Sequence, residues 1–208
     1  MPLPEELTRT DDAGVRRCWW CGDTPDYVAY HDNEWGMPVD DDTTLFEKMC
    51  LEGFQSGLSW LTILRKRESF RQAFAGFNPE RVAAYSKSDV ERLLQDASIV
   101  RHRKKIESVI NNAKAALKML ESRDSLAAFF WQFEPPTSPT IRQREDIVAN
   151  TDESTQLSKE LKRRGWSFVG PTTCYALMQA MGMVNDHLYD CNQWKVVERA
   201  RKKFRRPA

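Results

Sequence analysis

The feature of this sequence that most constrains its fold is a repeat of apolar residues every three or four positions. The repeat is most regular between residues 106 and 120, where one helix face collects Ile106, Val109, Ile110, Ala113, Leu117 and Leu120. Segments with the two-residue alternation of a half-buried strand are almost absent. The sequence therefore predicts an all-α protein.

Capping residues and helix breakers divide the rest of the chain. Asn78 followed by Pro79 is typical of a helix start, and Ser88 with Glu91 has the spacing of a capping box. A break at 97–98 leads into the long helix. Further helices are predicted at about 59–74, 125–134, 152–164 and 171–181, and the polar stretch 135–150 is predicted to be an exposed loop. At 208 residues the chain is long enough for one well-packed domain.

Charge is distributed unevenly along the chain, although the net charge is only +1. Residues 61–120 carry thirteen basic and six acidic side chains, and residues 195–208 carry seven basic and one acidic. Local fields of this kind suit a polyanionic partner, although a solvated helix face gives the same pattern. No apolar run reaches the roughly 20 residues of a membrane span, and the first residues lack the apolar run of a signal peptide. We expect a cytoplasmic protein with no membrane partner.

Cysteine and histidine gather in two clusters far apart in the sequence. Cys18, Cys21 and His31 lie near the N-terminus, and His187 with Cys191 forms an H-x3-C pair near the other end. Five cysteines, an odd number, do not suggest a disulfide framework. Thiolate and neutral imidazole are the ligands that zinc prefers, so the two clusters can together supply a four-coordinate site.

Two further interpretations of these clusters stay open. The CxxC formed by Cys18 and Cys21 can bind a metal by itself or act as a redox pair. Asp32 and Asp186 each stand next to a histidine, where they could accept a hydrogen bond from a metal-bound imidazole.

Longer stretches of the chain resemble the 3-methyladenine DNA glycosylase I family, part of the helix-hairpin-helix glycosylase group. They are RCWW at 17–20, DYVAYHDNEWG at 26–36, LFEKMCLEGFQSGLSW at 45–60, DVERLLQDASIVRHRKKI at 89–106 and GWSFVGPTTCYALMQAMGMVNDH at 165–187. The resemblance implies a monomeric, monofunctional base-excision repair enzyme. Such an enzyme hydrolyses the N-glycosidic bond of 3-methyladenine in alkylated double-stranded DNA and leaves the free base and an abasic site.

The same resemblance implies a division of the chain and a metal site. Residues 1–16 would be a flexible extension, residues 17–194 the helical glycosylase domain with its helix-hairpin-helix at about 89–106, and residues 195–208 a basic tail. One structural zinc ion per chain would join the two ends of the domain, and Cys21 would be a bystander thiol. The implied zinc ligands are Cys18, His31, His187 and Cys191.

The resemblance places the base pocket at Glu52, the implied catalytic residue, with Tyr27, Tyr30 and Trp60 as aromatic walls. Methylation at N3 puts positive charge on the adenine ring and makes it a good leaving group, so the enzyme must chiefly extrude, hold and recognise the base. Aromatic faces and a carboxylate suit a cationic base. The segment after the hairpin offers no persuasive catalytic Asp, which agrees with a narrow, monofunctional enzyme.

The implied DNA contacts lie in two loops. Gly57 and Leu58 match the positions that enter the DNA stack when the base is extruded. The hairpin would hold the backbone through its amide groups at Ser98 and through the basic residues that follow it, Arg101, Arg103 and Lys105. Ser98 stands where the family usually has Gly, which would cost about 1 kcal/mol if its φ were positive.

Two other functions are compatible with parts of this pattern. One is a non-enzymatic zinc-containing helix-hairpin-helix protein that binds DNA without a base pocket, against which Glu52, Tyr30 and Trp60 argue together. The other is a zinc hydrolase, which needs an open metal position that four protein ligands would fill. Release of free 3-methyladenine from methylated DNA separates all three.

Overall fold

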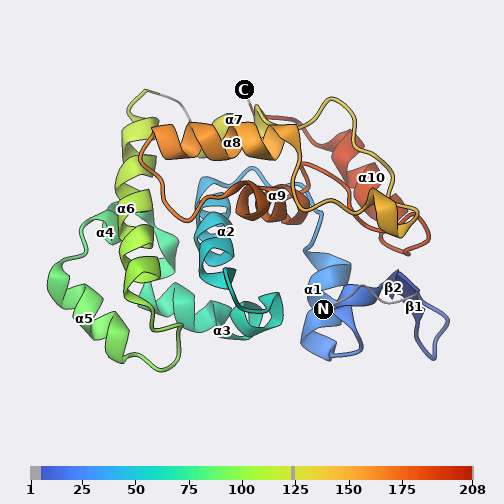
Figure 1. Ribbon diagram of the computed structural model, residues 1–208, viewed down its shortest axis with the longest axis horizontal. Coiled ribbons are helices and arrows are strands. Elements are labelled where there is room, and N and C mark those ends of the chain that lie inside the picture. The colour runs from blue at the N-terminus through green and yellow to red at the C-terminus, as the bar shows by residue number, and fades with distance from the viewer. Residues whose placement is uncertain (1–5, 123–124, 208) are drawn as a thin grey trace.

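Helices make up most of the chain in the computed structural model, which describes residues 6–122 and 125–207 (Figure 1). The predicted all-α fold is confirmed as a mostly helical single domain, which also contains one two-stranded sheet. The α-helices are α1 (Pro25–Asn33), α2 (Asp42–Gln55), α3 (Trp60–Ala73), α4 (Pro79–Ala83), α5 (Lys87–Gln95), α6 (Arg103–Leu120), α7 (Leu126–Trp131), α8 (Asp152–Arg163), α9 (Pro171–Ala180) and α10 (Trp194–Lys203). Short 3-10 helices lie at η1 (Trp19–Cys21), η2 (Ala75–Phe77) and η3 (Arg144–Asp146).

Helix α2 is the central element, because α3, α6, α7 and α9 all pack against it (Figure 1). Every residue from Leu45 to Phe54 is buried, so this helix carries polar side chains into the interior together with apolar ones. Its start is capped by the Asp41 carboxylate, which accepts from Thr44 N–H at 2.7 Å. The next residue, Asp42, accepts from the first amides of α7 at 3.0 and 2.8 Å. These caps fix where α2 begins and therefore which residues reach its far end.

The segment 86–106 folds as two helices, α5 and α6, joined by a tight connection. The capping box at its start uses Ser86 and Asp89 instead of the predicted pair Ser88 and Glu91, because Ser86 is the residue with extended backbone before α5. In the connection, Ser98 does not have a positive φ. Its N–H and hydroxyl both donate to the Asp96 carboxylate, at 2.9 and 2.5 Å. The replacement of Gly by Ser therefore imposes no left-handed strain here.

Near both ends of the chain, the described residues include regular secondary structure that the sequence did not suggest. Strand β1 (Thr8–Thr10) lies in the expected flexible extension and pairs antiparallel with β2 (Arg16–Cys18), with Thr8 opposite Cys18. Most of the expected basic tail forms α10, whose Arg201 donates to the carbonyls of Gly182 and Met183, both at 2.9 Å. The causes differ, because β1 is held by a neighbouring strand across a short turn, whereas α10 is held by contacts with residues much earlier in the chain. Sequence periodicity records neither kind of contact.

The loop 135–150 also differs from its prediction. Ile141 is 3% exposed and packs with Cys18, Leu188 and Cys191, so the middle of the loop covers the two clusters of cysteine and histidine. By contrast, the predicted ends of α8 and α9 agree with the structure to within one residue, each followed by a glycine with positive φ. Among the described residues, no helix is both long and apolar enough to cross a membrane.

Candidate functional site

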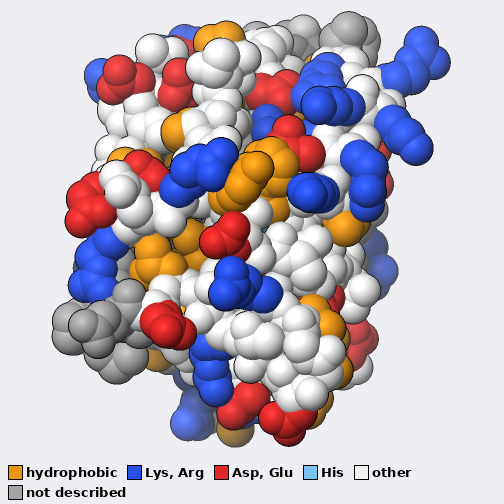
Figure 2. Space-filling model, turned by 90° about the vertical axis from the view of Figure 1, so that its right-hand side faces the viewer, with side chains coloured by type: hydrophobic (Ala, Val, Ile, Leu, Met, Phe, Trp, Pro, Cys, Tyr) orange, Lys and Arg blue, Asp and Glu red, His pale blue; other side chains and the backbone are white. Residues whose placement is uncertain are grey.

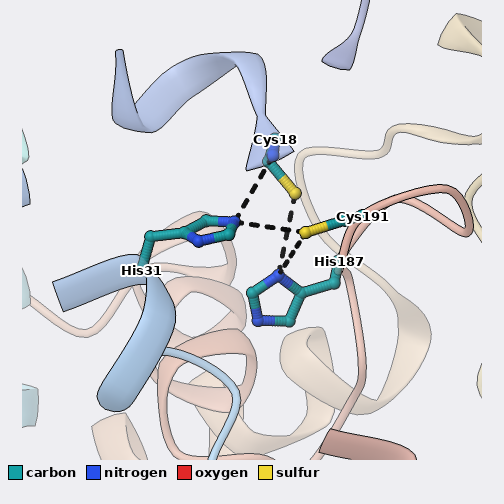
Figure 3. A group of neighbouring side chains, drawn as sticks. All are labelled: Cys18, His31, His187 and Cys191. Carbon is teal, nitrogen blue, oxygen red and sulfur yellow. Dashed lines mark hydrogen bonds between the residues drawn. The ribbon is translucent and has the colours of Figure 1, made fainter. Parts of the chain in front are cut away.

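The two clusters of cysteine and histidine meet in space. Cys18 at the end of β2, His31 on α1, and His187 and Cys191 before α10 are all buried, and their ligand atoms lie within 4.8 Å of one another (Figure 3). The Cys18 sulfur lies 3.7 Å from His187 Nδ1. The Cys191 sulfur lies 3.5 Å from His31 Nε2 and 3.6 Å from His187 Nδ1.

These separations fit a tetrahedral zinc ion. A tetrahedron with Zn–S of about 2.3 Å and Zn–N of about 2.0 Å has sulfur–nitrogen edges of about 3.5 Å. The three separations, 3.5, 3.6 and 3.7 Å, lie close to that edge. The two thiols are coupled, because Cys18 lowers the pKa of Cys191, whereas burial, followed by Cys191, raises the pKa of Cys18. The four residues can therefore hold a metal ion, and their chemistry fits zinc.

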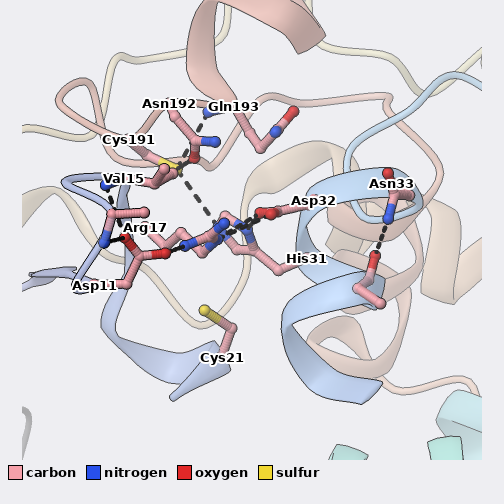
Figure 4. A network of polar contacts seen from close by, with 12 residues as sticks. Asp11, Val15, Arg17, Cys21, His31, Asp32, Asn33, Cys191, Asn192 and Gln193 are labelled. Carbon is pink, nitrogen blue, oxygen red and sulfur yellow. Dashed lines mark hydrogen bonds and ion pairs between the residues drawn. The ribbon is translucent and has the colours of Figure 1, made fainter. Parts of the chain in front are cut away.

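In each imidazole, the ring nitrogen that points away from the cluster also has a hydrogen-bond partner. This partner orients the ring so that its other nitrogen faces the cluster. His31 Nδ1 lies 2.7 Å from Asp32 Oδ1, and Asp32 accepts from Arg17 Nε at 2.9 and 3.0 Å (Figure 4). His187 Nε2 lies 3.0 Å from the carbonyl oxygen of Trp35. Asp32 is thus the acceptor that the sequence suggested. Arg17 belongs to β2, so the two-stranded sheet of β1 and β2 supports this cluster.

Asp186 does not take the corresponding role at His187. Its Oδ2 accepts from the Tyr175 hydroxyl at 2.7 Å and from Gln179 Nε2 at 2.8 Å, and the side chain faces the pocket described below. The sequence could not show that Asp186 and His187 face different sites, because side-chain direction follows no regular period in an irregular segment. Cys21 is buried beside the cluster, and its thiol donates to the Cys18 carbonyl at 3.1 Å. Burial raises the pKa of Cys21 to about 11, so it remains a thiol.

A pocket of about 210 Å³ lies between α1, the end of α2, α9 and the loop around Ile141. It is smaller than the roughly 300–1,000 Å³ of pockets for drug-sized ligands, so it suits a single planar ring system. All four predicted pocket residues belong to it. Its lining consists of Trp19, Trp20, Tyr27, Tyr30, Trp35, Glu52, Gln55, Trp60, Ile141, Ile147, Ala176, Gln179 and Asp186.

Three of the four predicted pocket residues contact a buried lysine. Glu52 is 5% exposed, and its Oε1 forms an ion pair of 2.7 Å with Lys48 Nζ, one helical turn earlier on α2. The same ammonium group donates to the Tyr30 hydroxyl at 2.9 Å and lies 3.2 Å from the centre of the Trp60 ring. Burial, followed by the charge of Glu52, raises the pKa of Tyr30 well above its usual range, so the phenol stays neutral.

Two buried polar atoms of the pocket have no hydrogen-bond partner among the described residues. They are Trp60 Nε1 and Asp186 Oδ1. Native structures rarely leave such groups unpaired, because each costs about 1–3 kcal/mol. Both atoms belong to residues that line the pocket, so a polar ligand that reaches them there would complete both.

The predicted DNA contacts lie at the surface, with one exception. Gly57, with φ of +81°, and Leu58, 42% exposed, form the tip of the loop between α2 and α3. Ser98, Arg101 and Arg103 are exposed around the α5–α6 connection. Arg103 forms an exposed ion pair with Glu91 at 2.8 Å.

Lys105 is the exception, because its side chain is directed inward. The residue is 6% exposed, and its ammonium group donates to the carbonyls of Phe54 and Ser56 at 2.8 and 2.6 Å. It therefore joins the start of α6 to the end of α2, and it is not placed to bind a phosphate. The sequence placed it among surface cations because it follows Arg103 and Lys104 in a basic run.

A comparison with known families agrees with this geometry. The sequence model of the methyladenine glycosylase family matches residues 20–195. The chain belongs to this family.

Curated relatives extend over almost the same part of this family member. DNA-3-methyladenine glycosylase 1 of Escherichia coli (strain K12) is 49% identical over 179 residues, which are 85% of this chain and 96% of the relative. DNA-3-methyladenine glycosylase of Haemophilus influenzae is 46% identical over 177 residues, 84% and 96% of the two chains.

Solved structures show the same fold. A crystal structure of 3-methyladenine DNA glycosylase I has a TM-score of 0.82 with 49% identity, covering 85% of this chain and 98% of the other. The structure that describes 3-methyladenine recognition by the enzyme of Staphylococcus aureus has a TM-score of 0.81 with 39% identity, covering 85% and 95%.

Two polar residues in or behind the pocket wall of this family member were not predicted from the sequence. Lys48, behind the wall, had no predicted role, and Asp186 was predicted only as a possible acceptor beside His187. A lysine four residues before a glutamate is usually an exposed helix pair, so the spacing gave no reason to place it inside. A weak signal was present in the segment itself, because the apolar residues around Lys48 cover almost every side of the helix.

Proposed function

We propose that this protein is a monofunctional DNA repair glycosylase that hydrolyses the N-glycosidic bond of 3-methyladenine in alkylated DNA. The observation that carries the proposal is the buried carboxylate of Glu52 inside an aromatic pocket of base size. The relatives described above carry the name DNA-3-methyladenine glycosylase, which supports the same substrate. In this proposal the chain acts as a monomer in the cytoplasm.

The chemistry requires recognition more than strong acid catalysis. When the bond between the sugar C1′ and the base nitrogen breaks, its electron pair leaves with the base and cancels the positive charge on the ring. Positive charge then develops on the sugar, as in other glycoside cleavage, and water adds to C1′ with loss of a proton. Glu52 attracts the cationic base, Tyr30 and Trp60 provide ring faces for it, and Trp60 Nε1 offers a free donor.

DNA would approach the side where Leu58 and the α5–α6 connection are exposed. Leu58 is an apolar side chain on a loop tip, a residue type that enters a base step while the target nucleotide turns out. We assign α5, the connection and α6 as the helix-hairpin-helix, with Ser98, Arg101 and Arg103 beside the DNA backbone. Lys105 would act indirectly, because it holds the two carbonyls that precede the loop tip.

The metal in this proposal is one structural zinc ion held by Cys18, His31, His187 and Cys191. Four protein donors complete a tetrahedron, and such closed sites stabilise a fold without binding substrate. The ion would join β2 and α1 to the segment before α10. This arrangement does not favour a zinc hydrolase, which needs a free coordination position.

The test is release of free base from duplex DNA treated with a methylating agent, followed by chromatography of the product. We expect 3-methyladenine and intact, abasic strands, because no lysine nucleophile is proposed. Binding of the duplex without base release would instead indicate a non-enzymatic DNA-binding protein. Strand cleavage that accompanies base release would contradict the monofunctional assignment.

A further inference from the structure

Lys48 is a buried cation behind the pocket wall, and the function proposed above assigns it no role. Lys48 is 6% exposed and does not line the pocket, whereas its partners Tyr30, Glu52 and Trp60 all do. Its ammonium group contacts the three of them at 2.7 Å for Glu52, 2.9 Å for Tyr30 and 3.2 Å for the Trp60 ring centre. Three walls of the pocket therefore meet on one atom, Lys48 Nζ.

A cation at this place is unexpected on electrostatic grounds. The pocket is proposed to attract a positively charged base, and a resident ammonium group weakens that attraction. Desolvation also lowers the pKa of Lys48, an effect that Glu52 opposes. Buried ion pairs add little stability over apolar residues of similar size, so stability alone does not explain the pair. The lysine needs a benefit that concerns Glu52 itself.

That benefit is a positive charge that no neighbouring group supplies. The side chain of Glu52 is 4% exposed, and an unpaired carboxylate at such depth takes up a proton. Arg67 is another cation that interacts with Lys48, but it forms a two-point ion pair with Glu34, at 2.5 and 3.0 Å. None of the other titratable groups around the pair can carry a positive charge. They are Tyr27, Tyr30, Glu34 and, across the pocket, Asp186.

We propose that Lys48 is a positioning residue that keeps Glu52 ionised and oriented at the pocket wall, and that it thereby sets the lowest pH at which the enzyme works. The proposal rests on the function assigned to the pocket. The bond to Tyr30 and the position over Trp60 make the same lysine hold the carboxylate and both aromatic walls in register.

The experiment compares base release as a function of pH in the full-length parent, Lys48→Met, Lys48→Gln and Lys48→Arg. Methionine keeps the volume, and glutamine keeps a donor without the charge. We expect the acid limb of kcat/KM to move upward by about 1–3 pH units in both neutral variants, the size of shift that one adjacent opposite charge produces. Arginine should return the limb toward that of the parent. Lys105→Met removes the other buried lysine and should leave the limb in place.

Binding of free 3-methyladenine by equilibrium dialysis over the same pH range is the second measurement. It also serves if one variant folds poorly or if the parent releases no base. An acid limb and a dialysis profile that coincide in Lys48→Gln and the parent would overturn the role of Lys48. A parent that binds the free base with the expected pH dependence but releases none from DNA would overturn the proposed function and leave the role of Lys48 supported.

Discussion

The proposed metal site, formed by Cys18, His31, His187 and Cys191, and the proposed base pocket around Glu52 are neighbouring regions with opposite properties. In the cluster the four donors face one point, and the outer nitrogen of each histidine has its own partner, Asp32 or the Trp35 carbonyl. In the pocket Trp60 Nε1 and Asp186 Oδ1 are buried without partners among the described residues. The first region would be complete with a single metal ion. The second is incomplete until a larger polar ligand enters, and this difference separates a structural site from a receptive one.

The two regions are nevertheless joined. Asp186 and His187 are consecutive, and one faces the pocket while the other faces the cluster. Trp20 lines the pocket and also lies 5.1 Å from the His31 ring. The cluster therefore positions part of the pocket wall. Loss of the metal should damage both regions, whereas changes in the pocket should leave the cluster unaffected.

The largest effect is expected for Cys191→Ser combined with His187→Ala. A cross-link that closes a loop of more than 100 residues is worth about 4–5 kcal/mol, and the free energy of unfolding should fall by a similar amount. The corresponding decrease in Tm is about 10–20 °C for a chain of this length. Elemental analysis should find one zinc ion in each parent chain and none in the variant.

Cys21→Ser is the matched control for the metal cluster. It removes a neighbouring buried thiol that donates to the backbone carbonyls of Cys18 and Gly22. We expect full zinc content and a Tm within a few degrees of the parent. Zinc loss in this variant would move the metal to the CxxC and break the comparison between the two regions, as would full zinc content after the double substitution.

The second effect concerns the charge in the pocket. Glu52→Gln keeps the shape but removes the anion, so base release should fall by about 10–1,000-fold if the charge contributes about 1–4 kcal/mol in a desolvated site. Glu47→Gln is the control, because Glu47 is another buried carboxylate of α2 and is paired with Arg71 away from the pocket. It should retain activity, and both variants should retain zinc. Equal activity of Glu52→Gln and the parent would show that the pocket assignment is wrong.

Sequence reasoning succeeded where local rules decide the structure. The ends of α8 and α9 followed from glycine after an apolar stripe, because only a few residue types tolerate the left-handed turn there. That Cys18 and Cys191 lie close together was predicted because zinc prefers cysteine and histidine ligands and because the family resemblance implied the same four residues. These features need no knowledge of how distant segments pack.

The errors lie where distant packing decides. In the sequence, Lys48 and Lys105 cannot be told from exposed lysines. They are buried only because α2 and the start of α6 are buried in the folded chain. Helix α10 has few apolar residues, and its position depends on Arg201 reaching two carbonyls and on Phe204 packing 4.5 Å from the Trp131 ring. Contacts of this kind have no period along the chain. Figure 2, which views the side of the molecule on which α10 lies, shows Lys and Arg side chains gathered in its upper right part.

The third effect concerns the aromatic wall. Trp60→Ala removes a ring face and the open Nε1 donor, so affinity for free 3-methyladenine should fall by about 1–3 kcal/mol. Trp131→Ala changes a buried tryptophan outside the pocket lining and controls for general loss of packing. Calorimetric titration of both variants with the free base measures the difference. A similar loss of affinity in the two would mean that stability, and not stacking, accounts for it.

The smallest effect is expected at the DNA-facing surface, and it sharpens the contrast between open and closed groups. Arg101 is exposed and free to meet a phosphate, whereas Lys105 is buried and already donates to two carbonyls. Arg101→Gln should therefore reduce the slope of log K against log salt for undamaged duplex by about 0.9, the value for one phosphate contact. Lys105→Met should lower the Tm and leave the slope as it is, because a side chain that binds no phosphate releases no counter-ion. Fluorescence anisotropy at several salt concentrations measures both slopes. A changed slope for Lys105→Met alone would mean that Lys105 leaves its buried position to contact DNA. An unchanged slope in both variants would mean that DNA binds elsewhere, and the exposed cations of α10 would be the next surface to test.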